Sequence, residues 1–106
     1  MSDIAIIGSG IAGLFSALKL ANAGHEVTVI TKQRLKDSST NWAQGGIAGI
    51  LDKTDIGAKE SHIEDTLTSG DGLCNESMVR EVIEGAAECI FELVNIGVQF
   101  EKNQQG

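Results

Sequence analysis

The N-terminal part of the chain alternates between two hydrophobic patterns that predict a strand, a helix and a second strand. Residues 3–7 form a short β-branched run, which is typical of a buried strand in a parallel sheet. Apolar residues then recur at three- and four-residue spacing over residues 11–23, which predicts a helix that Gly24 ends at its C′ position. A second apolar run over residues 27–30 predicts another strand, and the three elements together form a βαβ unit.

A polar stretch and a capping pattern follow in the second half of the chain. Residues 51–59 are polar and charged, and we expect them to form an exposed loop. Ser61 is followed three positions later by Glu64, a capping-box pattern that predicts a short helix from Ser61 to about Ser69. The Gly-Asp-Gly sequence of residues 70–72 should break this helix.

The last predicted helix has the clearest amphipathic pattern in the chain. Asn75 is a suitable N-cap, and Asn95 with Gly97 should end the helix. An apolar stripe at helical spacing predicts core packing and consists of Met78, Val79, Val82, Ile83, Ala86, Ile90, Phe91 and Val94. Residues 98–100 are expected to begin a further strand.

Composition limits the class of partner that this chain can bind. The net charge of −7 over 106 residues argues against nucleic acid and against an anionic membrane surface, because both require clustered Lys and Arg. No basic leader precedes an apolar segment, and no apolar run approaches the ~20 residues of a membrane span, so we expect a cytoplasmic location. Cys74 and Cys89 form no CxxC pair, and we expect no metal site.

A glycine-rich motif lies between the first predicted strand and the helix. It matches GxGxxG and consists of Gly8, Ser9, Gly10, Ile11, Ala12 and Gly13. In this setting Gly8 permits a tight turn, Gly10 lets a pyrophosphate approach the backbone, and Gly13 allows close packing of the helix on the strands. The motif therefore predicts a site for a dinucleotide diphosphate at the N-terminus of the helix.

The residues after the second strand leave the identity of the dinucleotide open. A carboxylate usually stands at this point and binds the ribose hydroxyls, but here Thr31 and Lys32 are followed by Gln33. A ribose bond from the Thr31 hydroxyl or the Lys32 ammonium remains possible. The turn alone is compatible with NAD, with NADP and with FAD.

A second motif favours FAD. The segment combines hydroxyls, amides and adjacent glycines, and consists of Ser39, Thr40, Asn41, Trp42, Ala43, Gln44, Gly45 and Gly46. Such a segment can lie along a long, buried cofactor and donate backbone hydrogen bonds to it, although a Gly-rich surface loop is the alternative. Trp42 is expected either near the cofactor or in the core.

The two motifs in this order resemble the fumarate reductase/succinate dehydrogenase flavoprotein family. The resemblance implies that residues 9–13 bind the FAD diphosphate, that Lys32 contacts the adenosine part, and that residues 39–46 run beside the diphosphate and flavin. Respiratory members carry a histidine that attaches FAD covalently just before the motif threonine. This chain has Ser39 there, so the resemblance implies non-covalent FAD.

Residues 61–74 are most similar to the family members that oxidise L-aspartate. The resemblance implies that the full-length enzyme converts L-aspartate to iminoaspartate for NAD biosynthesis and that residues 1–106 are the N-terminal part of a truncated FAD-binding domain. The expected fold is α/β, a Rossmann-like βαβ unit with following helices. The family's catalytic residues lie downstream, so none is assigned here, and His62 is expected to be structural. A succinate dehydrogenase or fumarate reductase subunit and a non-catalytic nucleotide-binding domain are the alternatives.

Overall fold

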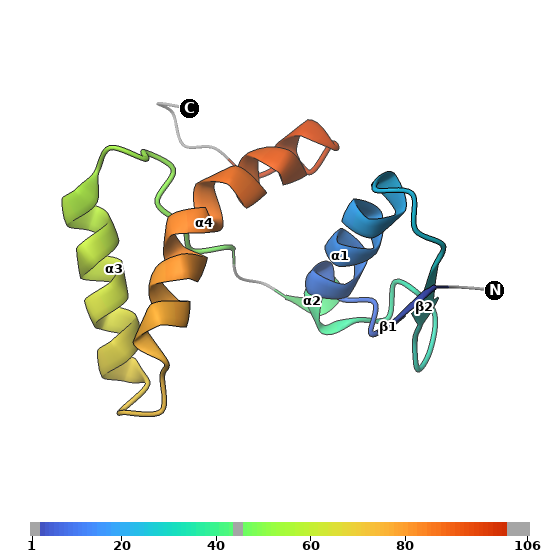
Figure 1. The fold of residues 1–106 in the computed structure, drawn as a ribbon, viewed down its shortest axis with the longest axis horizontal. Coiled ribbons are helices and arrows are strands. Elements are labelled where there is room, and N and C mark those ends of the chain that lie inside the picture. Colours follow the sequence, from blue (N-terminus) through green and yellow to red (C-terminus); the bar gives the residue numbers. More distant parts are fainter. Residues whose placement is uncertain (1–2, 44–45, 102–106) are drawn as a thin grey trace. The chain divides into compact units, whose positions relative to one another are not determined.

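The computed structural model describes residues 3–43 and 46–101 and divides the chain into two compact units (Figure 1). The first unit is Met1–Gly46 and the second is Ile47–Gly106. Strands occur only in the first unit among the described residues, and the two long helices of the C-terminal half form the second.

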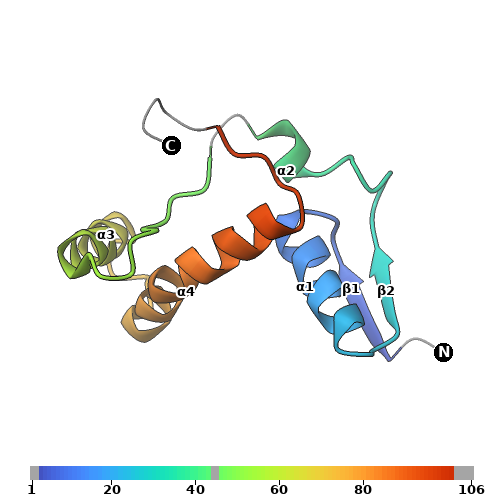
Figure 2. The ribbon, with the colours of Figure 1, turned by 90° about the horizontal axis from the view of Figure 1, so that it is seen from above.

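The first unit is the βαβ arrangement that the sequence predicts. Its elements are β1 (Ile4–Ile7), α1 (Ile11–Asn22), β2 (Val27–Ile30) and a short α2 (Ser39–Trp42). β1 and β2 pair in parallel, with Ile4 opposite Val27 and Ile7 opposite Ile30. Helix α1 lies along the two strands and ends before Gly24, which has the positive φ of +93° expected at C′ (Figure 2).

The predicted burial of the strands is met only in part, because one face is half-buried and the other is exposed. Helix α1 covers the face that includes Ile6, which lies beneath Gly13. On the opposite face Ile7 is 86% exposed and Ile30 is 50% exposed. A continuous apolar run makes both faces of a strand hydrophobic, but the described residues supply a cover for only one of them.

The second unit is a pair of helices joined by a tight turn. Helix α3 (Ile56–Ser69) and helix α4 (Glu76–Asn95) lie side by side in both views (Figures 1 and 2). The buried apolar residues of the described chain all belong to these helices: Ile63, Ile83, Ala87 and Leu93. Arg80 on α4 also donates to the Glu60 carboxylate on α3, with an Nη1–Oε1 distance of 2.8 Å.

Helix α3 begins six residues earlier than the capping-box pattern indicates. Asp55 is the N-cap, because its carboxylate accepts a hydrogen bond from the Ala58 backbone N–H at 2.9 Å. Ser61 consequently lies inside the helix, and the predicted loop over residues 51–59 is wrong from Ile56 onward. The predicted break after the helix is confirmed, since Asp71 has a positive φ of 46°.

Helix α4 begins and ends where the sequence predicts. The Asn75 side chain accepts from the Met78 N–H at 3.2 Å, and Gly97 has a φ of +107° just beyond the helix. Residues 98–100 do not form the expected strand. A strand requires a neighbour to pair with, and the sheet within the described residues contains β1 and β2 alone.

The apolar stripe of α4 is only partly buried. Ile83 is in the core, whereas Met78, Val82, Phe91 and Val94 are between 45% and 66% exposed. Core packing is therefore the wrong prediction for these four residues within the described chain. No helix in residues 3–43 and 46–101 is both long and apolar enough to cross a membrane.

Candidate functional site

The glycine-rich turn starts at the carboxyl ends of the paired strands. The Gly8 N–H donates to the Ile30 carbonyl at 2.8 Å, so the turn leaves β1 beside the end of β2. Gly8 has a φ of +110°, a conformation that side chains other than glycine rarely adopt. Gly10 then acts as the N-cap of α1, and its carbonyl accepts from the Leu14 N–H at 3.0 Å.

Close backbone packing requires the last glycine of the motif. A Cβ atom added to Gly13 would collide with the Gly8 carbonyl oxygen and touch the Ile6 side chain. A Cβ atom on Gly10 would lie 3.3 Å from the Thr40 Oγ1 atom, on the side of the turn that faces α2. Gly13 therefore lets α1 approach β1, and Gly10 lets the Thr40 side chain lie close to the turn.

The N-terminus of α1 retains hydrogen-bond donors and a partial positive charge. Gly10 supplies no capping side chain, and the first turn contains no acidic residue. Ile11 donates its N–H to the Thr40 hydroxyl at 3.0 Å. Ala12 and Gly13 follow in the same first turn, where backbone N–H groups have no partner within the helix. This arrangement is suited to an anionic group such as a diphosphate.

The second motif meets the first through Thr40. Helix α2 places this threonine beside the N-terminus of α1, although the two bonded residues are 29 positions apart in sequence. Ser38 caps α2 by accepting from the Asn41 N–H at 3.4 Å. Trp42 is 75% exposed, which contradicts the core alternative, and its place near the cofactor stays a prediction.

The remaining residues of the second motif have fewer defined contacts. Ser39, Asn41, Ala43 and Gly46 are exposed, while Gln44 and Gly45 lie outside the described residues. The sequence did not predict that residues 39–42 are helical, because four residues are too few for a periodic pattern. The structure thus brings Thr40 to the glycine turn through the hydrogen bond with Ile11.

The end of β2 holds the glycine turn from the other side. The Thr31 hydroxyl lies 3.1 Å from the Ser9 hydroxyl, and Ser9 is only 5% exposed. Lys32, the next residue, is exposed. Sequence reasoning treated Thr31 only as a ribose ligand and did not identify its contact with Ser9. The sequence signal for this contact was a hydroxyl residue at the carboxyl end of β2, next to the turn.

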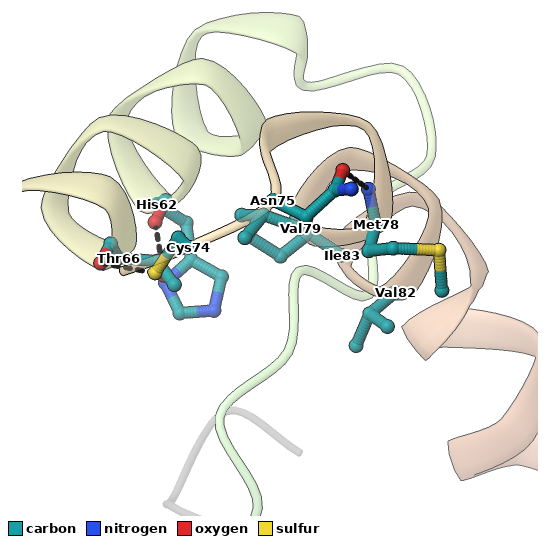
Figure 3. A pocket seen from close by; sticks show the side chains of 8 residues that line it. All are labelled: His62, Thr66, Cys74, Asn75, Met78, Val79, Val82 and Ile83. Carbon is teal, nitrogen blue, oxygen red and sulfur yellow. Dashed lines mark hydrogen bonds between the residues drawn. The ribbon is translucent and has the colours of Figure 1, made fainter. Parts of the chain in front are cut away.

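A hollow of about 390 Å³ opens on the second unit (Figure 3). Its lining is mostly apolar and consists of His62, Thr66, Cys74, Asn75, Met78, Val79, Val82 and Ile83. The polar groups bond locally, since Thr66 Oγ1 donates to the His62 carbonyl at 2.7 Å and Cys74 Sγ to the Thr66 carbonyl at 3.7 Å. The bond to His62 uses its backbone carbonyl, so the structural role of its side chain stays a prediction.

A glycine turn between parallel strands, opening onto an uncapped helix N-terminus, defines a dinucleotide-binding βαβ unit. Comparison with known families identifies the cofactor. Residues 3–106 match the family described as FAD binding domain, and the chain belongs to that family. FAD is accordingly its cofactor, and the backbone donors at the N-terminus of α1, where the first turn has no acidic residue, fit the diphosphate of that molecule.

Several curated relatives carry the name L-aspartate oxidase. The chain is 47% identical over 104 residues to the protein from Pseudomonas aeruginosa, and the match covers 97% of this chain and 19% of that protein. It is 40% identical over 105 residues to the protein from Streptomyces coelicolor, with 99% of this chain and 18% of that protein covered. The chain thus spans about a fifth of the length of these relatives.

A solved structure shows the same fold. The chain matches a variant of FrdA from E. coli quinol fumarate reductase with a TM-score of 0.85 and 30% sequence identity. The match covers 99% of this chain and 18% of that chain. The predicted α/β fold with an incomplete FAD-binding domain is therefore confirmed.

Proposed function

We propose that the two glycine-containing motifs together hold the FAD diphosphate at the N-terminus of α1. The hydrogen bond from the Ile11 N–H to the Thr40 hydroxyl carries this proposal, because it brings the second motif to the helix end. The proposed site comprises Gly8, Ser9, Gly10, Ile11, Ala12, Gly13, Lys32, Ser39, Thr40, Asn41, Trp42, Ala43, Gln44, Gly45 and Gly46.

These residues have different roles in the proposed site. Backbone N–H groups of the first turn of α1 donate to the phosphate oxygens, and the helix dipole stabilises their negative charge. Lys32, exposed after β2, contacts the adenosine part. Thr40 shares its hydroxyl between the Ile11 N–H and the bound diphosphate, since a hydroxyl both donates and accepts.

The full-length protein is proposed to be an L-aspartate oxidase that forms iminoaspartate in the cytoplasm for NAD biosynthesis. Relatives of that name are 40% and 47% identical to this chain, which supports the assignment. FAD, when bound, supplies the acceptor for the electrons that leave the substrate. The present residues bind and orient the cofactor as the N-terminal part of the FAD-binding domain, and none of them is assigned to catalysis.

A flavin release experiment tests the proposal and its non-covalent form. The purified protein should show flavin absorption, and acid precipitation should leave the flavin in the supernatant, because Ser39 cannot form a histidyl–flavin bond. A protein that stays colourless when FAD is added would contradict the proposal. Yellow colour retained in the pellet would instead support a covalent flavoprotein subunit, the alternative favoured by the structural similarity to FrdA.

A further inference from the structure

We propose that Thr31 is a positioning residue that fixes the glycine turn in its FAD-binding conformation through Ser9. The proposal rests on the function assigned to that turn above. A dinucleotide fold usually has a ribose-binding acid at the end of its second strand. Here Thr31 follows β2, and its hydroxyl contacts Ser9 in the glycine turn. Lys32, the next residue, then remains available for the adenosine part.

The burial of Ser9 indicates that the conformation of the turn depends on its contact with Thr31. Ser9 is the one buried polar residue among those that the structure describes. Its hydroxyl lies 3.1 Å from the Thr31 hydroxyl, across a sequence separation of 22 positions. A buried hydroxyl without a partner is unfavourable, so a turn that lost Thr31 would move until Ser9 reached another partner or water.

The position of Ser9 within the motif explains why the contact affects binding. Ser9 lies between Gly8 and Gly10, and glycines leave the backbone of the turn with unusual conformational freedom. The Ser9 side chain is therefore the group through which the rest of the fold can restrict the conformation of this turn. A turn that samples other conformations binds ligand more weakly, in proportion to the fraction of time spent in the competent one.

Three variants and their combination test the contact in the flavin-binding protein. Thr31→Val removes the hydroxyl and keeps the shape, Thr31→Ser restores a hydroxyl, and Ser9→Ala removes the other partner. We expect Thr31→Val and Ser9→Ala each to weaken FAD binding about fivefold, the effect of one hydrogen bond. Thr31→Ser should bind as the parent does, and the double variant Ser9→Ala with Thr31→Val should be no weaker than either single variant. The dissociation constant is measured by the quenching of flavin fluorescence.

A control and a second measurement separate positioning from general destabilisation. Thr68→Val makes the same substitution at an exposed site on α3 and should leave FAD affinity unchanged. Hydrogen exchange without FAD should be faster in Thr31→Val at the Gly8 amide, which donates to the Ile30 carbonyl, and unchanged in α3. This measurement tests the contact even in a protein that binds FAD too weakly for titration.

The outcomes distinguish this inference from the function on which it rests. A parent protein that binds no FAD would overturn the proposed function. If the parent binds and Thr31→Val binds equally well, only the role of Thr31 is refuted. Losses that add in the double variant would also refute it, because they would mean that Ser9 and Thr31 contact FAD independently.

Discussion

The glycines of the turn differ in whether folding or ligand binding requires them. Gly8 and Gly13 are fixed by the fold, the first through its positive φ and the second through contact with the Gly8 carbonyl. Gly10 differs, because its φ of −73° and ψ of 177° are open to any residue. The lack of a side chain at Gly10 lets Thr40 lie close to the turn, since a Cβ atom would be 3.3 Å from the Thr40 Oγ1 atom.

Substitution of Gly10 should therefore remove binding while leaving the fold. We expect Gly10→Val to lose detectable FAD binding, because its side chain would occupy the place of the diphosphate. The melting temperature without FAD should fall only modestly, because the Thr40 side chain must shift away from a Cβ atom that would lie 3.3 Å from its Oγ1 atom. Titration with FAD and a thermal melt measure both quantities, with Gly85→Val on α4 as control, since a Cβ atom there meets nothing within 4 Å. FAD binding by Gly10→Val at the parent affinity would contradict the placement of the diphosphate.

The sequence predicted the motif residues better than the contacts between them. The GxGxxG spacing identifies three glycines, because Gly8 and Gly13 meet local backbone requirements and Gly10 keeps a side chain out of the turn. The bonds of Ser9 to Thr31 and of Ile11 to Thr40 join residues 22 and 29 positions apart. Such pairs depend on how β2 and α2 are placed in space, which hydrophobic periodicity does not encode.

At the scale of the element, the start of α3 shows how local capping signals compete. Ser61 with Glu64 matches a capping box, yet Asp55 caps the helix through the Ala58 N–H. Both patterns place a suitable acceptor three residues before a backbone donor. Sequence alone did not decide which residue is the N-cap, because the residues between Asp55 and Ser61 are all compatible with a helix.

Removal of each candidate cap should distinguish them. Asp55→Ala should lower the free energy of unfolding by about 1 kcal/mol, the usual cost of losing an N-cap. Ser61→Ala should not destabilise the protein, because Ser61 lies inside α3 and alanine is the better helix former. Denaturant titration followed by circular dichroism measures both variants. A larger loss for Ser61→Ala than for Asp55→Ala would return the start of the helix to Ser61.

The turn before α3 gives a pH-dependent prediction. The Asp52 carboxylate accepts hydrogen bonds from the Thr54 hydroxyl and backbone N–H, at 2.6 and 2.8 Å, and these bonds lower the pKa of Asp52. A lowered carboxylate pKa stabilises the fold above the ordinary value of 3.8, and this contribution is lost as the pH falls through the folded pKa.

Loss of the Thr54 hydroxyl should reverse that shift in part. In Thr54→Val the pKa of Asp52 should rise toward 3.8, because the largest cause of its lowering is removed. The shift is measured by NMR titration of the Asp52 side chain, with Thr68→Val as the control. An unchanged Asp52 titration in Thr54→Val would show that the hydroxyl contact is absent in solution.

At the scale of the whole molecule, the two units differ in how they bury apolar surface. The buried apolar residues that the structure describes lie in α3 and α4, whereas Ser9 is the buried residue of the first unit. The sequence predicted the type of β1, α1, β2, α3 and α4 correctly but missed α2 and predicted a strand over residues 98–100 that does not form. Periodicity reports which face of an element is apolar. It does not report what covers that face, which is why the exposure of Ile7 and Val82 was not predicted.

This difference in apolar burial between the two units predicts where FAD changes the protection of backbone amides from hydrogen exchange. Without FAD, the slowest-exchanging amides should lie in α3 and α4 around Ile63 and Ala87, because local stability follows apolar burial. FAD should then slow exchange mainly in the first unit, at residues 9–14, since a ligand stabilises the conformations that bind it.

Hydrogen exchange followed by mass spectrometry, with and without FAD, measures this pattern, and Gly10→Val provides the sample in which added FAD should have no effect. Equal protection of both units by FAD would mean that the cofactor acts through global folding rather than at the turn. Protection confined to α3 and α4 would place the cofactor at the second unit instead. Protection at residues 9–14 would mean that FAD orders the glycine turn. Apolar burial does not explain such protection, since the described apolar core lies in α3 and α4.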